Sequence, residues 1–181
     1  DSGSCSGGNR NGSTAYEPGS GSTIQAYAGI CGNDNLQSNS DAYFHGISLD
    51  EMTAHVTTGS GGTCGTTITT GNPIPVVSVP SGFTIPAETP FSLTGSATDD
   101  TPGSLTYTWE EFDLGPAGPP GNGTAPFFRS FNPTAEPVRT FPQFDRYVAG
   151  LPTVVGEDLP TTTWSLTFRL TARDNAPGAG A

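Results

Sequence analysis

The sequence contains no lysine, and its six basic residues are all arginines. Seventeen acidic residues oppose them, which gives the chain a net charge of −11 at pH 7. Nucleic acids and anionic membrane surfaces would repel such a chain, so neither is expected as a partner. The sequence also lacks any run of the roughly 18 apolar residues that a membrane-spanning helix needs, and no signal-peptide pattern opens it.

Glycine and proline are abundant, with 25 and 17 residues, whereas charged residues make up only 13% of the chain. This composition is typical of short strands joined by many turns, so a mainly β fold is expected. The 181 residues are enough for one or two domains and can bury a core.

Residues 22–32 are small, apolar or β-branched and follow a Gly-Ser-Gly run, which predicts a tight buried turn. This segment belongs to three runs, YEPGSGSTI (16–24), AYAGICG (26–32) and NLQSNSDAYFH (35–45). The runs resemble the end of the catalytic domain in secreted bacterial reprolysin-like zinc metallopeptidases, which are metzincins. There the segment forms the Met-turn, a hairpin below the zinc site. Gln25 stands where the family has its methionine, and Tyr27 where some metzincins place a tyrosine that approaches zinc.

A metzincin binds zinc through His-Glu-x-x-His-x-x-Gly-x-x-His, in which the glutamate activates the zinc-bound water. This sequence holds only His45 and His55, without that motif. The resemblance therefore implies that the motif lies before Asp1, that zinc belongs to the parent enzyme only, and that this chain alone is inactive. A glutamine below a metal site needs hydrogen bonds that an apolar floor lacks, so either Gln25 faces solvent or the site has been abandoned.

Three cysteines in a lysine-free, Thr/Ser/Gly-rich chain indicate an oxidising compartment, so a secreted, extracellular protein is expected. Cys5 and Cys31 bracket the predicted turn, and a disulfide between them would stabilise it by roughly 3 kcal/mol. Cys64 is then left over. The resemblance implies a partner for it in the upstream segment; the alternative is a free buried thiol.

Ser48-Leu49-Asp50-Glu51 forms a capping box, which predicts a short helix over about residues 49–56 with Ser48 as its N-cap. Thr/Gly-rich residues follow, and regular alternation begins only after Asn72. We therefore expect three parts. Residues 1–64 form the tail of the metzincin-like catalytic domain, residues 65–74 a linker, and residues 75–181 a second domain.

Alternating apolar residues predict strands near 76–79, 91–97, 105–110 and 164–172, each of the last three with one buried face. Together they predict an antiparallel, immunoglobulin-like β-sandwich. The runs TGSATD (94–99), LTYTW (105–109) and LTARDN (170–175) also resemble PKD-like modules of secreted bacterial proteins. A further strand follows the Asp-Asn pair in those modules, so this sandwich is expected to lack its last strand. The proline-rich residues 113–160 are expected to supply middle strands.

Asp99, Asp100 and Asp174 follow predicted strands, and the acidic run 110–113 could meet them at one end of the sandwich. Calcium takes six to eight oxygen ligands at roughly 2.4 Å, so these residues form a candidate calcium site. The alternative is that the carboxylates cap turns and solvate strand edges.

The leading hypothesis is the non-catalytic C-terminal portion of a secreted zinc metalloendopeptidase, with the upstream part of the same precursor as partner. The alternative is an extracellular structural or adhesive module in which another copy adds a strand to the incomplete sandwich and builds a filament. Carbohydrate binding through Trp109 and Trp164 is disfavoured, because both alternate onto the predicted core face.

Overall fold

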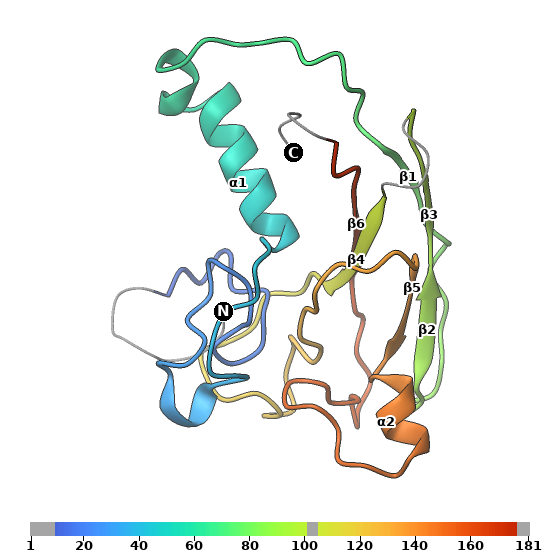
Figure 1. The fold of residues 1–181 in the computed structure, drawn as a ribbon. Helices are drawn as coiled ribbons and strands as arrows, with labels where there is room; N and C mark the ends of the chain where they lie inside the picture. The colour runs from blue at the N-terminus through green and yellow to red at the C-terminus, as the bar shows by residue number, and fades with distance from the viewer. Residues whose placement is uncertain (1–9, 101–104, 177–181) are drawn as a thin grey trace.

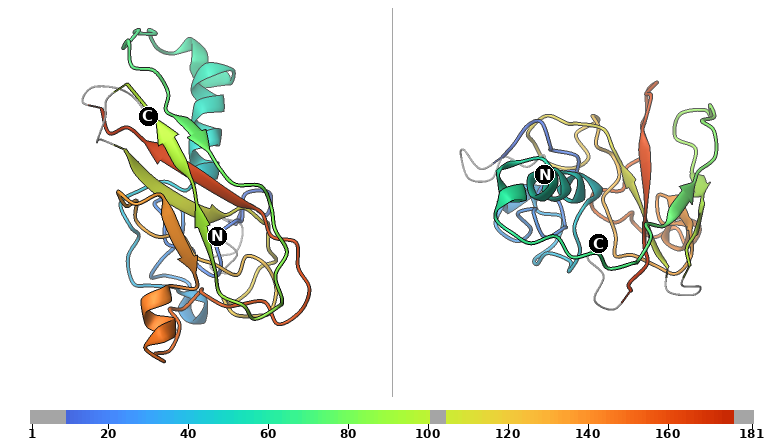
Figure 2. Two further views of the ribbon diagram at one scale, coloured as in Figure 1. Left: turned by 90° about the vertical axis from the view of Figure 1, so that its right-hand side faces the viewer. Right: turned by 90° about the horizontal axis from the view of Figure 1, so that it is seen from above.

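The computed structural model describes residues 10–100 and 105–176. In chain order its elements are η1 (Gly32–Asp34), α1 (Gly46–Thr57), η2 (Ser60–Thr63), β1 (Val76–Ser78), β2 (Phe91–Thr94), β3 (Ser96–Thr98), β4 (Thr106–Glu111), β5 (Val138–Phe141), α2 (Phe144–Val148) and β6 (Phe168–Arg173). Residues 10–45, here called the N-terminal layer, lie on one side together with α1 (Figure 1). Figure 2 shows β4 and β6 between this layer and the other strands.

The strands form three two-stranded antiparallel sheets, β1–β3, β2–β5 and β4–β6. The mainly β prediction is therefore confirmed. Gly95 separates β2 from β3, where the alternation predicted one continuous strand. A Cβ at Gly95 would lie 2.3 Å from Cδ2 of Leu170 in β6, so a larger residue would have to push this core side chain aside.

The apolar core gathers side chains from β2, β4, β5, β6 and the segment before β5. Its buried members are Leu93, Trp109, Ala125, Phe127, Phe128, Phe141 and Leu170. The Phe128 and Phe141 rings lie 5.1 Å apart, edge to face, and are 1% and 0% exposed. The proline-rich segment thus supplies both a paired strand, β5, and the centre of the core, which confirms the prediction that part of it pairs.

Strand β4 is buried on both faces, because the N-terminal layer covers the face that the core does not. Thr108, Trp109, Glu110 and Glu111 are all at most 5% exposed. The prediction of a single buried face was wrong here. The predicted strand over residues 164–172 was also too long at its start, since β6 begins at Phe168.

Helix α1 begins at Gly46, and its N-cap is His45. The Nδ1 atom of His45 accepts a hydrogen bond from Ile47 N at 3.2 Å. The predicted N-cap, Ser48, lies buried inside the first turn, so the capping-box prediction was wrong. The helix starts earlier because Gly46 N donates to the Glu110 carboxylate of β4 at 2.9 Å, which satisfies a free donor of the first turn.

Residues 65–75, here called the arch, connect η2 to β1 without helix or strand (Figure 1). They include the predicted linker. The N-terminal layer nevertheless packs directly on the strands, since Ser22 Oγ donates to Ser130 O at 3.2 Å and the Tyr16 and Phe112 rings stack 4.2 Å apart. In the described part of the chain no helix is long and apolar enough to cross a membrane.

Candidate functional site

A cavity of about 560 Å³ opens between the N-terminal layer and α1, over the turn that the sequence singled out. We call it the turn cavity. It is lined by Arg10, Asn11, Thr14, Tyr16, Glu17, Gln25, Tyr27, His45, Ile47, Ser48, Glu51, Met52, His55 and Val56. Its volume lies within the range of about 300–1,000 Å³ that is typical of ligand pockets.

One buried carboxylate, that of Glu17, builds the turn below this cavity. Its Oε1 atom accepts hydrogen bonds from Ser22 N at 2.8 Å and Thr23 N at 3.1 Å, and Oε2 accepts from Thr23 Oγ1 at 2.7 Å. Gly21 takes a φ of 66°, and a Cβ there would lie 2.7 Å from the Ala26 Cβ. Ser22 and Thr23 are fully buried, so the prediction of a tight buried turn is confirmed for the start of the segment. It was wrong for most of the rest, since Ile24 and Ile30 are 44% and 67% exposed.

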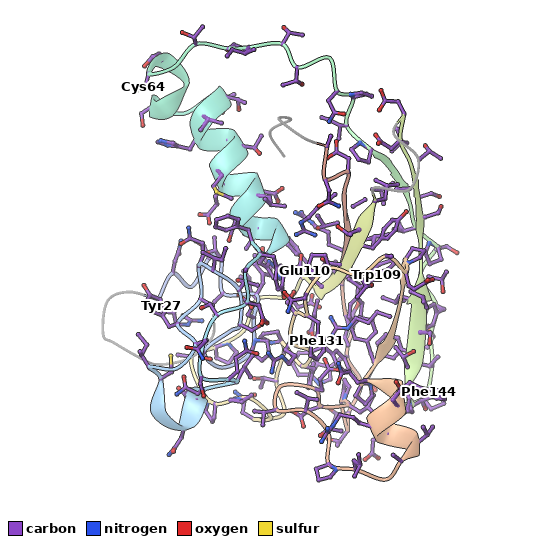
Figure 3. The ribbon with its side chains drawn as sticks, viewed as in Figure 1. Tyr27, Cys64, Trp109, Glu110, Phe131 and Phe144 are labelled. Atoms are coloured by element: carbon purple, nitrogen blue, oxygen red, sulfur yellow. The ribbon has the colours of Figure 1, made fainter. Side chains whose placement is uncertain are left out.

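The two residues at the predicted Met-turn position both line the turn cavity. Gln25 is exposed, so its side-chain amide can form hydrogen bonds with solvent and needs no partner in the protein. Tyr27 is half-buried, and its backbone N–H donates to Ser20 O at 3.0 Å. In Figure 3 Tyr27 lies in the N-terminal layer, well apart from Trp109 and Phe144.

The two histidines that line the cavity have different surroundings. His45 is 2% exposed, and with Nδ1 occupied as an acceptor its Nε2 faces Glu110 Oε1 at 3.8 Å. Its ring also stacks on Phe112 at 5.9 Å. His55 lies exposed on the last turn of α1 against η2. Within the described ranges no group of three or more His, Cys, Asp and Glu side chains is placed to hold a metal ion.

Behind His45, charged side chains are buried between the N-terminal layer and the core. Glu110 and Glu157 are fully buried, and Glu111 is 1% exposed. Ser130 Oγ donates to Glu110 Oε1 at 2.8 Å, and Arg139 Nη2 donates to Glu157 Oε1 at 2.6 Å. Figure 3 shows Glu110 close to the start of α1. Sequence reasoning missed this cluster, because alternation placed Glu110 on a solvent face.

The Glu111 carboxylate has the most perturbed environment of these acids. Burial, opposed by hydrogen bonds from Phe128 N and Phe127 N at 2.8 and 2.7 Å, raises its pKa to about 8. Its other oxygen, Oε1, has no hydrogen-bond partner among the described residues. This carboxyl is therefore mostly protonated at neutral pH.

The three acids of the candidate calcium site lie after β3 and β6. The Asp174 carboxylate accepts hydrogen bonds from Asn72 Nδ2 and from Ala176 N, and these bonds lower its pKa. Glu110 and Glu111 do not join it, because the register places Asp174 beyond the Thr106 end of β4. A calcium site at Asp99, Asp100 and Asp174 stays a prediction.

The remaining predicted features lie elsewhere. Cys64 is an exposed free thiol just after η2, not a buried one. Cys5 lies outside the described residues, so its disulfide with Cys31 stays a prediction. Trp109 is 5% exposed and its Nε1 donates to Pro137 O at 3.1 Å, whereas Trp164 is 42% exposed and packs on Phe127 at 5.1 Å.

Residues 16–45, which carry the resemblance to metzincins, form most of the N-terminal layer and contribute several residues to the lining of the turn cavity. Comparisons of the chain with protein-family models, with curated proteins and with solved structures find no match.

Proposed function

We propose that this chain is the non-catalytic C-terminal portion of a secreted zinc metalloendopeptidase. In this proposal the N-terminal layer is the floor of the peptidase site. The zinc-binding histidines and the general base come from a separate segment, which sits in the turn cavity. The immunoglobulin-like strands form an accessory domain behind that floor.

One observation carries the proposal: the turn that resembles a Met-turn lies under an open cavity, with Gln25 and Tyr27 in its lining. The buried polar groups of the lining, Glu17 and His45, are engaged by other groups of the chain. The Glu17 carboxylate holds the turn, and both nitrogens of His45 face protein groups, Ile47 N and Glu110. The buried part of the lining is therefore held by the chain's own hydrogen bonds, which suits a supporting role.

The first test is the intact mass and metal content of the native protein, purified from its source. We expect a polypeptide well above 18.5 kDa that carries about one zinc ion and hydrolyses casein until a chelator is added. A native chain of 18.5 kDa without zinc would contradict the proposal.

A second prediction concerns Gln25→Trp in the native-length protein. The indole would project from the exposed Gln25 position into the turn cavity and displace whatever segment occupies it. We expect casein hydrolysis to fall about 10²-fold, since displacing a catalytic group by about 1 Å has such an effect.

The matched control for this variant is Asn39→Trp, an equal enlargement at an exposed position of the same layer that does not line the cavity. It should keep near-normal activity. Equal activities of the two variants would argue against a peptidase site over the turn.

A further inference from the structure

Strand β6 has one paired edge and one open edge. Phe112 N donates to Thr167 O at 2.8 Å, and the register of β4 with β6 is continuous. Because hydrogen-bonded and non-hydrogen-bonded pairs alternate in an antiparallel ladder, the odd-numbered residues of β6 bond to β4. The backbone N–H and C=O groups of Phe168, Leu170 and Ala172 therefore point to the opposite edge.

Across residues 10–100 and 105–176, no backbone hydrogen bond reaches these three outward-facing residues. Strand β1 lies near β6 but is hydrogen-bonded to β3 instead. The outer edge of β4, by contrast, is covered: Tyr107 and Thr134 exchange backbone hydrogen bonds, and Arg139 Nη1 donates to Trp109 O. Three N–H and three C=O groups on this edge of β6 therefore have no backbone partner among the described residues, as at the edge of a sheet that could take up a further strand.

The arch carries a segment suited to pair with this edge. Residues 66–70 are Thr-Thr-Ile-Thr-Thr, five residues with β-branched side chains and no charge. All five are exposed, with Ile68 at 79%, and in the described structure no backbone hydrogen bond ties them to the rest of the chain. Their length equals that of β6 from Phe168 to Ala172.

In its own chain the segment is held at both ends, so it runs from η2 toward β1 and does not pair with β6. At one end η2 packs against α1. At the other, Asn72 Nδ2 donates to the Asp174 carboxylate just past β6. Figure 1 shows the arch crossing from the end of η2 to β1. This arrangement keeps residues 66–70 exposed, where a second molecule can reach them.

We propose that residues 66–70 of one copy add as a strand to the open edge of β6 in a second copy. The exchange can be reciprocal, since every copy carries both the segment and the edge. Main-chain hydrogen bonds supply the affinity, and neither zinc nor the turn cavity takes part. The inference therefore does not rest on the proposed function.

The net charge of the chain predicts how self-association depends on salt. Each copy carries a net charge of −11, so two copies repel at long range, whereas the inserted segment itself is uncharged. Salt screens that repulsion and leaves backbone hydrogen bonds in place. We expect association to be stronger at about 0.5 M NaCl than at about 0.05 M.

The test is sedimentation equilibrium of the full chain from about 10 to about 500 µM, where a weak main-chain interface would populate. A Cys64→Ser background prevents covalent dimers through the exposed thiol. We expect masses that rise with concentration toward multiples of 18.5 kDa, and more steeply in high salt. A strict monomer at both salt concentrations would overturn the inference.

The segment is tested with Ile68→Pro, which removes a strand N–H at an exposed site, and with Ile68→Thr as the matched control. The proline variant should raise the dissociation constant at least about tenfold, the threonine variant less than about threefold, both with wild-type circular dichroism. Amide exchange on association should slow at Phe168, Leu170 and Ala172. Unchanged association of Ile68→Pro, or unchanged exchange at these amides, would show that copies meet elsewhere.

Discussion

Replacing Arg139 with methionine is expected to lower the free energy of unfolding by about 3–5 kcal/mol at neutral pH. The guanidinium pairs with the fully buried Glu157 carboxylate and also donates to Trp109 O and Arg129 O, each at 2.6 Å. The variant leaves one carboxylate and two carbonyl groups without their donor. Urea titration of the wild type and the variant measures the difference.

The pair itself contributes less than this loss suggests. Burial raises the pKa of Glu157 and lowers that of Arg139, so desolvation outweighs the attraction between the two charges. Adding Glu157→Gln to Arg139→Met removes the stranded charge while keeping an acceptor for Gln143 N. The double variant should regain at least about 1 kcal/mol over the single one.

The matched control is Asp50→Asn, which breaks a pair of the same 2.6 Å length to Arg169. There the two side chains are 54% and 36% exposed, and we expect a loss below about 1 kcal/mol. If Arg139→Met and Asp50→Asn lowered the free energy of unfolding equally, burial would not explain the effect at Arg139.

Stability is expected to fall as the pH rises from about 5 to about 8, with Glu111 as the main contributor. Its pKa is raised from 4.5 to about 8 in the folded chain, mainly by burial, with Asp113 raising it further and Arg139 opposing. Between these values the folded state holds a proton that the unfolded state has released. Each rise of one pH unit in this window therefore lowers the free energy of unfolding by up to about 1.4 kcal/mol.

Glu111→Gln should flatten that dependence. The amide oxygen can keep the hydrogen bonds from Phe127 N and Phe128 N, and no proton has to be lost at high pH. Denaturant titrations at about pH 5 and pH 8 measure the slope, with Glu51→Gln as a control at an exposed carboxylate on α1. An unchanged slope in Glu111→Gln would assign the pH dependence to other groups.

The sequence predicted those features that depend on local pattern. The mainly β composition, β1 and the alternation of β2 follow from strand propensity, and the buried turn follows from its glycines. The start of α1 could not be read locally, because its first N–H bonds to Glu110, 64 residues away. A glutamate in an alternating strand looks solvent-exposed unless the layer that covers it is known.

The same limit explains the candidate site. Tyr27 and Gln25 were found through a motif, but the cavity above them depends on how α1 packs, which no local pattern encodes. The Arg139–Glu157 pair joins β5 to a loop, and neither residue belongs to a motif. Such buried pairs are determined by tertiary packing. The sequence indicates them only where a charged residue falls within a predicted core segment and so needs a buried partner.

The contact between α1 and β4 determines what happens when the chain is cut in the arch. Gly46 N binds the buried Glu110 carboxylate and Ser22 binds Ser130, so the two halves are joined inside the protein as well as through the exposed arch. A protease that cuts the arch severs only the outer connection. The two fragments are expected to remain together as a nicked complex and to part only when the whole structure unfolds.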